Sequence, residues 1–129
     1  MKTDCIFCKI LKGEIPAVKI WEDEKHFAFL DMSPINLGHT LLIPKKHTEY
    51  LFDLNDEEYK ELMLKAKFLA KLLKNKLKSK RIGLIVEGFL IPHAHIHLVP
   101  LNKGGELSFE KAKPMSKEEL KKIAEKILK

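Results

Sequence analysis

The stretch PHAHIHLVP, residues 92–100, carries the pattern from which the rest of the fold can be worked out. In it His93, His95 and His97 alternate with apolar residues. Successive side chains of an extended strand point to opposite faces, so the three imidazoles are expected on one face and the apolar residues on the other, against a core. Neighbouring imidazoles would be about 6–7 Å apart along such a strand. That spacing allows the rings to serve one substrate group or one metal ion.

The chain around this strand predicts an α+β fold built on a five-stranded antiparallel sheet. The expected strands are short apolar runs bounded by turn residues, at 18–21, 27–30, 39–43, 82–87 and 93–99. The last two are expected to pair as a hairpin across residues 88–91. Five strands without regular alternation of strand and helix favour antiparallel pairing over a parallel sheet.

Two principal helices are expected to cover this sheet. Residues 56–76 repeat apolar side chains at helical spacing after Asn55, which has the residue type of an N-cap. Ser116 and Glu119 form a capping box before a final helix over about 117–128. A short helical turn is expected at residues 8–11. A polar connection is expected over residues 102–114.

Length and composition indicate one globular domain over residues 1–129. No apolar run reaches the length of a membrane span, and residues 1–5 contain no apolar signal core, so a cytoplasmic protein is expected. The net charge of +6 comes almost entirely from lysine. We interpret these lysines as a solvated surface, because specific nucleic-acid recognition usually relies on arginine and exposed aromatic residues. Phosphate binding by this surface stays open as an alternative.

Cys5 and Cys8 are the only two cysteines, arranged as Cys-x-x-Cys. Two cysteines cannot supply a disulfide framework, so they are either a redox pair or half of a metal site. A redox pair usually follows a strand and lies at a helix N-terminus that lowers a thiol pKa, and no strand pattern precedes these cysteines. Two further ligands from the histidines would complete a zinc site.

The three histidines allow two kinds of chemistry. In one, the rings bind a catalytic zinc ion and leave a position for water. In the other, a neutral imidazole attacks phosphorus and forms a covalent intermediate, while its neighbours orient it and donate to phosphate oxygens. Histidine suits this second role because its unperturbed pKa of about 6.5 leaves an unprotonated nitrogen at neutral pH.

These segments resemble the histidine triad, or HIT, family of nucleotide hydrolases and transferases. The strand HAHIHLV at 93–99 matches the family signature, in which histidines alternate with apolar residues. The family's other segments are matched in order, by DCIFCKI at 4–10, GEIPA at 13–17, AFLDMSP at 28–34 and GHTLLIPKKH at 38–47. The resemblance covers about residues 4–100 and implies the α+β fold, usually as a homodimer in which the long helix is a candidate interface element.

The resemblance implies a role for each matched residue. His95 would attack the α-phosphorus of a purine nucleotide derivative, His97 would orient His95 or contact the phosphate, and His39 would support both. Asp31 would bind the ribose hydroxyls, a task suited to a carboxylate acceptor. The residues matching the lining around the nucleoside and its base are Met32, Phe7, Ile10, Ile15 and Phe29.

The family also implies a structural zinc ion. In its Cys-x-x-Cys branch two histidines complete the ligand set, and the matching residues here are Cys5, Cys8, His47 and His93. This assignment leaves His95 available for phosphorus. The alternatives are zinc on the triad itself, a dinucleoside polyphosphate hydrolase of the same family, and a nucleotide-binding regulator with little catalysis.

One segment departs from the family pattern. Residues 86–92 read VEGFLIP, and Phe89 stands where the family commonly has glutamine. Gly88 still matches a family glycine. The departure leaves the leaving-group contacts unassigned. His26 matches no motif and is expected on the surface.

Overall fold

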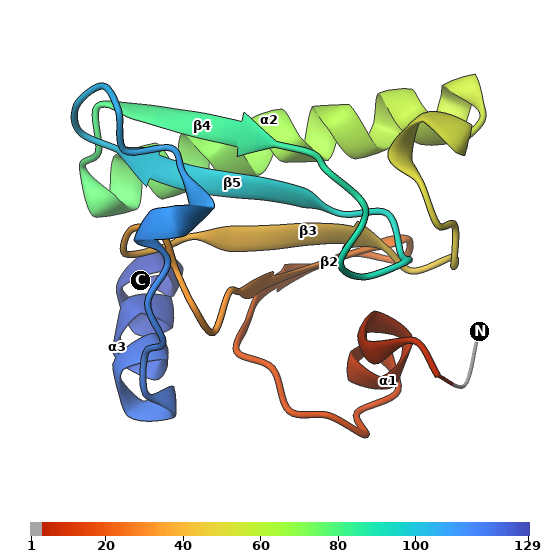
Figure 1. Ribbon diagram of the computed structural model, residues 1–129, viewed down its shortest axis with the longest axis horizontal. Helices are drawn as coiled ribbons and strands as arrows, with labels where there is room; N and C mark the ends of the chain where they lie inside the picture. Colours follow the sequence, from red (N-terminus) through yellow and green to blue (C-terminus); the bar gives the residue numbers. More distant parts are fainter. Residues whose placement is uncertain (1–3) are drawn as a thin grey trace.

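A computed structural model describes residues 4–129, so the first three residues of the N-terminal stretch considered above lie outside the described part. Figure 1 shows the arrangement of the elements. In chain order they are α1 (Ile6–Leu11), β1 (Lys19–Glu22), β2 (His26–Leu30), β3 (Thr40–Pro44), η1 (Leu51–Asp53), α2 (Asp56–Leu77), β4 (Arg81–Ile85), β5 (Ile96–Leu101), η2 (Phe109–Lys111) and α3 (Lys117–Leu128).

The five strands form one sheet in the order β1-β2-β3-β5-β4, and every neighbouring pair is antiparallel. The α+β class with a five-stranded antiparallel sheet is thus confirmed. In Figure 1, α2 runs along the sheet behind β4 and β5, and α1 is drawn below β3. α1 packs on the sheet, since its Phe7 ring lies 5.5 Å from the Phe29 ring of β2. Within residues 4–129 no helix combines the length and the apolar character needed to cross a bilayer.

Alternation along the central strands divides the interior into two clusters. Leu42, Ile96 and Leu98 point toward α2 and α3 and join the larger cluster. On the other face, Leu41 and Phe29 pack with the cysteines of α1 in a smaller cluster. Because both faces are covered, all five residues of β2 and of β3 are buried. The second face, with α1 on it, is the one that holds the functional side chains.

The two long helices begin as the capping residues predict. The Asn55 side chain accepts a hydrogen bond from the Glu58 backbone N–H at 2.8 Å, so α2 starts at Asp56. Ser116 and Glu119 form both hydrogen bonds of the expected capping box at the start of α3. These ends fix where each helix meets the sheet.

The expected strand over 93–99 is wrong at its start, since β5 begins only at Ile96. Pro92 has no N–H to donate, the His93 N–H bonds to the Ile91 carbonyl at 2.8 Å, and the Ala94 N–H bonds to the Thr48 carbonyl at 2.6 Å. These bonds direct the segment toward the chain after β3 and away from β4. β4 and β5 pair as the predicted hairpin, but its connection spans residues 86–95.

Three smaller expectations also need correction. His26 is not on the surface: it is the first residue of β2, is 4% exposed, and its Nδ1 lies 2.9 Å from an Asp23 carboxylate oxygen. The connection over 102–114 contains the short helix η2. The first helix starts at Ile6, two residues earlier than expected, because the Cys5 side chain caps it.

Candidate functional site

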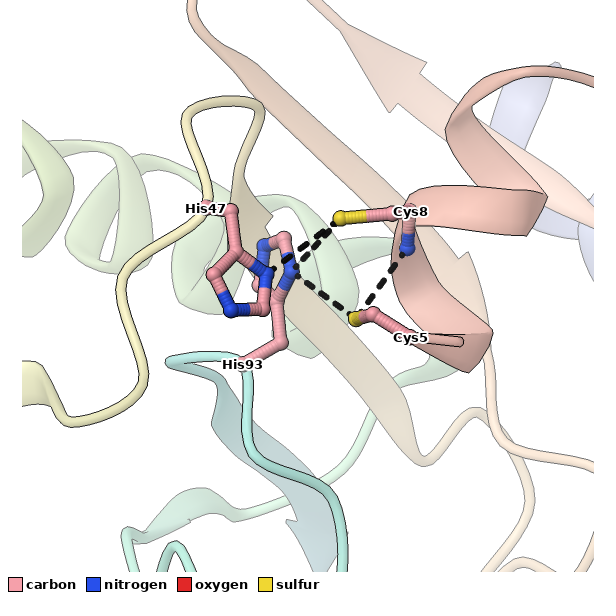
Figure 2. A group of neighbouring side chains, drawn as sticks. All are labelled: Cys5, Cys8, His47 and His93. Atoms are coloured by element: carbon pink, nitrogen blue, oxygen red, sulfur yellow. Dashed lines mark hydrogen bonds between the residues drawn. The ribbon is translucent and has the colours of Figure 1, made fainter. Parts of the chain in front are cut away.

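Four metal-ligand side chains from three parts of the chain meet beside α1 (Figure 2). Cys5 caps α1 and Cys8 lies in its first turn, whereas His47 follows β3 and His93 precedes β5. Their ligand atoms all lie within 4.8 Å of one another, and three of the four residues are buried. The sheet thus brings together the four residues for which the sequence implied a shared metal ion.

The distances within this cluster fit a tetrahedral metal site. His93 Nδ1 lies 3.4 Å from Cys5 Sγ and 3.6 Å from Cys8 Sγ, and His47 Nδ1 lies 3.3 Å from Cys8 Sγ. Zn–S bonds of about 2.3 Å and Zn–N bonds of about 2.0–2.1 Å give a tetrahedron with S···N edges of about 3.6 Å. Two thiols and two imidazoles are also the donor set that zinc prefers in closed structural sites.

Hydrogen bonding prepares His93 for this role. Its Nε2 lies 2.8 Å from the Pro44 carbonyl oxygen, which can only accept, so Nε2 carries the ring proton. The lone pair on Nδ1 then faces the two sulfur atoms, and the Pro44 carbonyl is the kind of outer partner that metal-bound histidines usually have. His47 differs, because its Nε2 is buried with no hydrogen-bond partner among residues 4–129.

His95 is held with the opposite ring nitrogen available. Its Nδ1 lies 2.7 Å from the His93 carbonyl oxygen and therefore donates its proton to it. In the neutral ring Nε2 keeps its lone pair, and no hydrogen bond within residues 4–129 occupies it. The Phe7 ring packs edge-on at 5.1 Å between centroids and fixes the plane of the imidazole. His95 thus offers an oriented nucleophilic nitrogen.

A chain of hydrogen bonds fixes the proton of His97. The Ile35 backbone N–H donates to His39 Nδ1 at 3.0 Å, so the neutral His39 ring carries its proton on Nε2. His39 Nε2 lies 3.0 Å from His97 Nδ1 and donates to it, which leaves the His97 proton on Nε2. Burial lowers the pKa of His39 and the pKa of His97 to about 4, so both rings are neutral at neutral pH. His97 is therefore an N–H donor beside His95.

Asp31 lies directly after β2, next to this pair of rings. Its Oδ1 accepts from the Ser33 backbone N–H at 2.9 Å, and its Oδ2 lies 3.5 Å from His39 Nε2 and 4.0 Å from His97 Nδ1. Burial raises the pKa of the Asp31 carboxyl, against the opposing effects of the Ser33 hydrogen bond and the neighbouring imidazoles. The carboxylate is thus an acceptor at the edge of the histidine cluster.

Asp31, His95 and His97 line one cavity of about 690 Å³. The eight residues that the sequence analysis assigned to the nucleotide all contribute to its wall, namely Phe7, Ile10, Ile15, Phe29, Asp31, Met32, His95 and His97. His39 is not in the wall; it lies behind His97, 1% exposed. The wall is mostly apolar, with its hydrogen-bonding groups gathered at the histidines, an arrangement typical of small-molecule sites.

Sequence reasoning missed one part of this wall and left the contacts of another unassigned. The Phe109 ring lies edge-on to His97 with 5.0 Å between centroids, although the surrounding segment was expected to be only a polar connection. Glu87 to Ile91, in the connection before the triad, forms another stretch of the wall. The one available signal was the presence of large apolar residues, Phe89 and Phe109, in segments that otherwise read as loops.

The geometry does not support a metal ion shared by the three triad histidines. His93 Nδ1 faces the cysteines, and His97 Nδ1 accepts from His39. A second group of ligand types, Asp31, His39 and His97, also lies within 4.8 Å. Binding a metal through His39 Nε2 would require loss of the proton from a ring whose other nitrogen already accepts from the Ile35 N–H. This group is therefore arranged as a hydrogen-bond chain.

Comparison with known proteins identifies similar chains. An adenosine 5'-monophosphoramidase of Saccharomyces cerevisiae is 40% identical over 133 aligned positions, which cover 92% of this chain and 82% of the yeast protein. A crystal structure of a HIT-like protein involved in cell-cycle regulation from Bartonella henselae superposes with a TM-score of 0.87 at 30% identity, over 98% of this chain and 96% of that one.

A third similarity concerns the metal. The crystal structure of a zinc-bound histidine triad family protein from Mycobacterium smegmatis has a TM-score of 0.82 at 30% identity and covers 97% of this chain and 93% of its own. The family model described as the HIT domain matches residues 12–104. The chain therefore belongs to the HIT family, as its sequence motifs indicated.

Proposed function

We propose that the protein is a nucleotide phosphoramidase, hydrolase or nucleotidyltransferase that acts at the α-phosphate of a purine nucleotide derivative. The observation that carries this proposal is the orientation of His95, whose hydrogen bond to the His93 carbonyl leaves Nε2 for the substrate in a cavity of about 690 Å³. Family membership and the phosphoramidase relatives support hydrolysis of nucleotides as the general activity.

The proposed reaction has two steps. His95 Nε2 forms a bond to the α-phosphorus while the bond from phosphorus to the leaving group breaks. The leaving atom takes a proton from solvent water, and His97 Nε2–H donates a hydrogen bond to it. Water then attacks phosphorus and gives its proton to the solvent while the N–P bond breaks, which releases the nucleoside monophosphate and the neutral His95 ring. Because the Ile35 and His39 hydrogen bonds hold the His97 proton on Nε2, this ring can donate its hydrogen bond in both steps.

The remainder of the cavity supports binding of a nucleoside. Phe7 and Phe29, packed edge to face at 5.5 Å, supply an apolar wall against which a base can lie. Asp31 supplies the acceptor that paired ribose hydroxyls need. The roles proposed for these residues follow from this chemistry and from the family motif that they match.

We also propose that Cys5, Cys8, His47 and His93 bind a structural zinc ion. The ion would hold α1 and the segment around His93 together, so that it fixes the backbone carbonyl on which His95 depends. No catalytic step passes through it. The proposal is supported by the donor set, by the S···N distances, and by the tautomer that the Pro44 carbonyl imposes on His93.

Three further proposals concern the whole molecule. We propose one HIT domain that includes α3, because α3 packs on α2 and β1. We propose a homodimer, since β4 forms an edge of the sheet with Leu84 43% exposed, and α2 exposes Leu64 and Phe68. A cytoplasmic location fits a cysteine-ligated metal, because thiols stay reduced there. Light scattering on the purified protein would report the mass of the assembly.

The proposed mechanism is tested with adenosine 5'-phosphoramidate as substrate. His95→Ala should abolish turnover but retain binding of adenosine monophosphate, measured by calorimetry. His26→Ala is the matched control, because it removes a buried imidazole whose Nδ1 faces Asp23, outside the cavity wall. Turnover retained by His95→Ala would refute the mechanism. Binding without turnover in the unmodified protein would instead support the alternative of a nucleotide-binding regulator.

A further inference from the structure

A second cavity, of about 300 Å³, lies where the first turns of α2 meet the start of β2 and the end of β3. Its described lining is mostly charged and consists of lysines, glutamates and one histidine, His26, with two apolar residues. Within residues 4–129 this lining shares no residue with the triad cavity or with the four proposed zinc ligands. The proposed function therefore assigns no role to the second cavity.

The buried His26 ring has a fixed proton on one of its nitrogens. Its Nδ1 lies 2.9 Å and 3.1 Å from the two carboxylate oxygens of Asp23. Burial acts to raise the pKa of Asp23, but hydrogen bonds from His26 and from the Lys25 and His26 backbone N–H groups outweigh it and lower that pKa. An ionised carboxylate can only accept, so in the neutral ring Nδ1 carries the proton and Nε2 keeps its lone pair.

The other nitrogen of His26 opens into the second cavity. In the part of the chain that the structure describes, Nε2 forms no hydrogen bond, and the fully buried side-chain atoms that lack one are His47 Nε2 and Ser79 Oγ. His26 Nε2 is therefore accessible to solvent, and the cavity that His26 lines is where that access lies. A carboxylate behind Nδ1 and a lone pair on Nε2 form the arrangement that metal-bound histidines usually have.

Glu58 and Glu61 bring carboxylates to the same cavity. They are three residues apart on α2 and so lie on one side of the helix. Glu58 Oε2 lies 3.2 Å from Lys46 Nζ, and the two side chains are 35% and 70% exposed. Glu61 Oε2 lies 3.5 Å from Lys25 Nζ, and these side chains are 41% and 71% exposed. Such exposed pairs are weak, so a cation that binds more strongly can replace the lysines, which then extend into water.

We infer that His26, Glu58 and Glu61 form a binding site for one divalent transition-metal ion, separate from the proposed zinc site. His26 Nε2 would supply the imidazole ligand, and each glutamate would supply carboxylate oxygen after it turns away from its lysine. A mixed set of imidazole and carboxylate ligands suits ions such as Mn²⁺, Fe²⁺, Ni²⁺ and Zn²⁺.

The charges disfavour an anion as the occupant of this cavity. The third lysine of the lining, Lys45, is already held by Glu22, with 2.7 Å between Nζ and Oε2. If the lysines turned to an anion, the less exposed glutamates would stay unpaired beside it, at a cost in repulsion. A metal ion instead frees the more exposed partner of each pair.

The test titrates Ni²⁺ into the zinc-loaded protein by calorimetry, with the zinc content measured before and after. One Ni²⁺ should bind per chain without release of zinc. His26→Ala should abolish this binding, and Glu58→Gln should weaken it about tenfold, because a charged ligand is lost. Asp23→Asn should weaken it about 10–100-fold, the usual cost of removing the partner behind a metal-bound histidine.

Lys46→Ala should give a result that neither an anion site nor a purely structural role of His26 would produce. It frees Glu58, so Ni²⁺ should bind up to about fivefold more tightly, a factor set by the strength of an exposed ion pair. Lys60→Ala and Glu57→Gln are the matched controls, because they make the same changes in a neighbouring ion pair of α2 outside the cavity. Neither control should alter the affinity for Ni²⁺.

The inference would be overturned by the absence of Ni²⁺ binding, or by equal binding to His26→Ala. It would also fail if Glu58→Gln weakened binding no more than Glu57→Gln does. Inorganic phosphate is titrated in parallel, and phosphate binding that is lost in Lys46→Ala would identify an anion site instead. These outcomes leave the proposed reaction of His95 untouched, since the two sites share no described residue.

Discussion

Acidification should destabilise the fold through the pair of rings at the centre of the site. The pKa of His39 and the pKa of His97 are lowered from 6.5 to about 4 in the folded protein, because burial disfavours the charged rings. The unfolded chain therefore binds more protons between these two values. The free energy of unfolding is therefore highest above pH 6.5, where the two rings are neutral in both states. It falls as the pH decreases toward 4, because protonation of the rings favours the unfolded chain.

The size of the effect follows from the two pKa values. Between pH 7 and pH 5, a histidine with a pKa of 6.5 unfolded and about 4 folded loses about 2 kcal/mol of its contribution to the free energy of unfolding. The two rings together account for about 4 kcal/mol. His39→Gln removes one titrating group, so the variant should lose about 2 kcal/mol less than the unmodified protein over the same range.

Urea unfolding followed by the fluorescence of Trp21, the only tryptophan, measures both free energies. At each pH the free energy of unfolding of His39→Gln is subtracted from that of the unmodified protein, at the same zinc concentration. This difference cancels the contribution of the remaining titrating groups. Leu69→Ala is the control, because Leu69 is fully buried and its truncation costs about 2–5 kcal/mol at either pH without removing a titrating group. Equal pH dependence of His39→Gln and the unmodified protein would refute the assignment of neutral buried rings.

Three further outcomes are expected. Cys8→Ser should lower the bound zinc measured by elemental analysis and reduce the midpoint of thermal unfolding. His95→Ala should retain the metal. Full zinc content in Cys8→Ser would argue against the four-ligand site. Asp31→Asn should raise KM for adenosine 5'-phosphoramidate about tenfold, because it removes a charged acceptor, and an unchanged KM would exclude ribose contact. Ser116→Ala should cost about 1 kcal/mol in urea unfolding through loss of the α3 cap, and an unchanged midpoint would contradict the capping box.

Local sequence rules predicted the parts of the fold that depend on neighbouring residues. The start of α2 follows from Asn55 and that of α3 from Ser116, because each side chain bonds to a backbone N–H three residues later. The antiparallel sheet was also predicted, since short apolar runs bounded by turn residues, without regular alternation of strand and helix, can be recognised along the chain.

Features that depend on distant contacts were not predictable in the same way. The histidine stretch alternates like a strand, but Thr48, more than forty residues earlier, takes the hydrogen bond that keeps residue 94 out of the sheet. As a result His93 and His95 have unequal surroundings, one facing cysteines and the other the cavity. No local pattern indicates that Phe109 packs on His97.

The candidate site depended on the family motif more than on periodicity. Spacing alone left open whether the triad binds a metal or attacks phosphorus. The motif assigned His93 to the cysteines and His95 to phosphorus, and the hydrogen bonds to the Pro44 and His93 carbonyls are what make those assignments chemically consistent. Tautomers of this kind depend on backbone carbonyls that the sequence does not locate.

His95 Nε2 is the proposed nucleophile, and trapping the covalent intermediate is the decisive experiment. The protein is mixed with adenosine 5'-phosphoramidate, quenched within one turnover at a pH that preserves N–P bonds, digested and sequenced by mass spectrometry. We expect one adenylyl group on the peptide that contains residues 92–100, located on His95 and missing from His95→Ala. An adduct on His93 or His97, or turnover without any adduct, would contradict it.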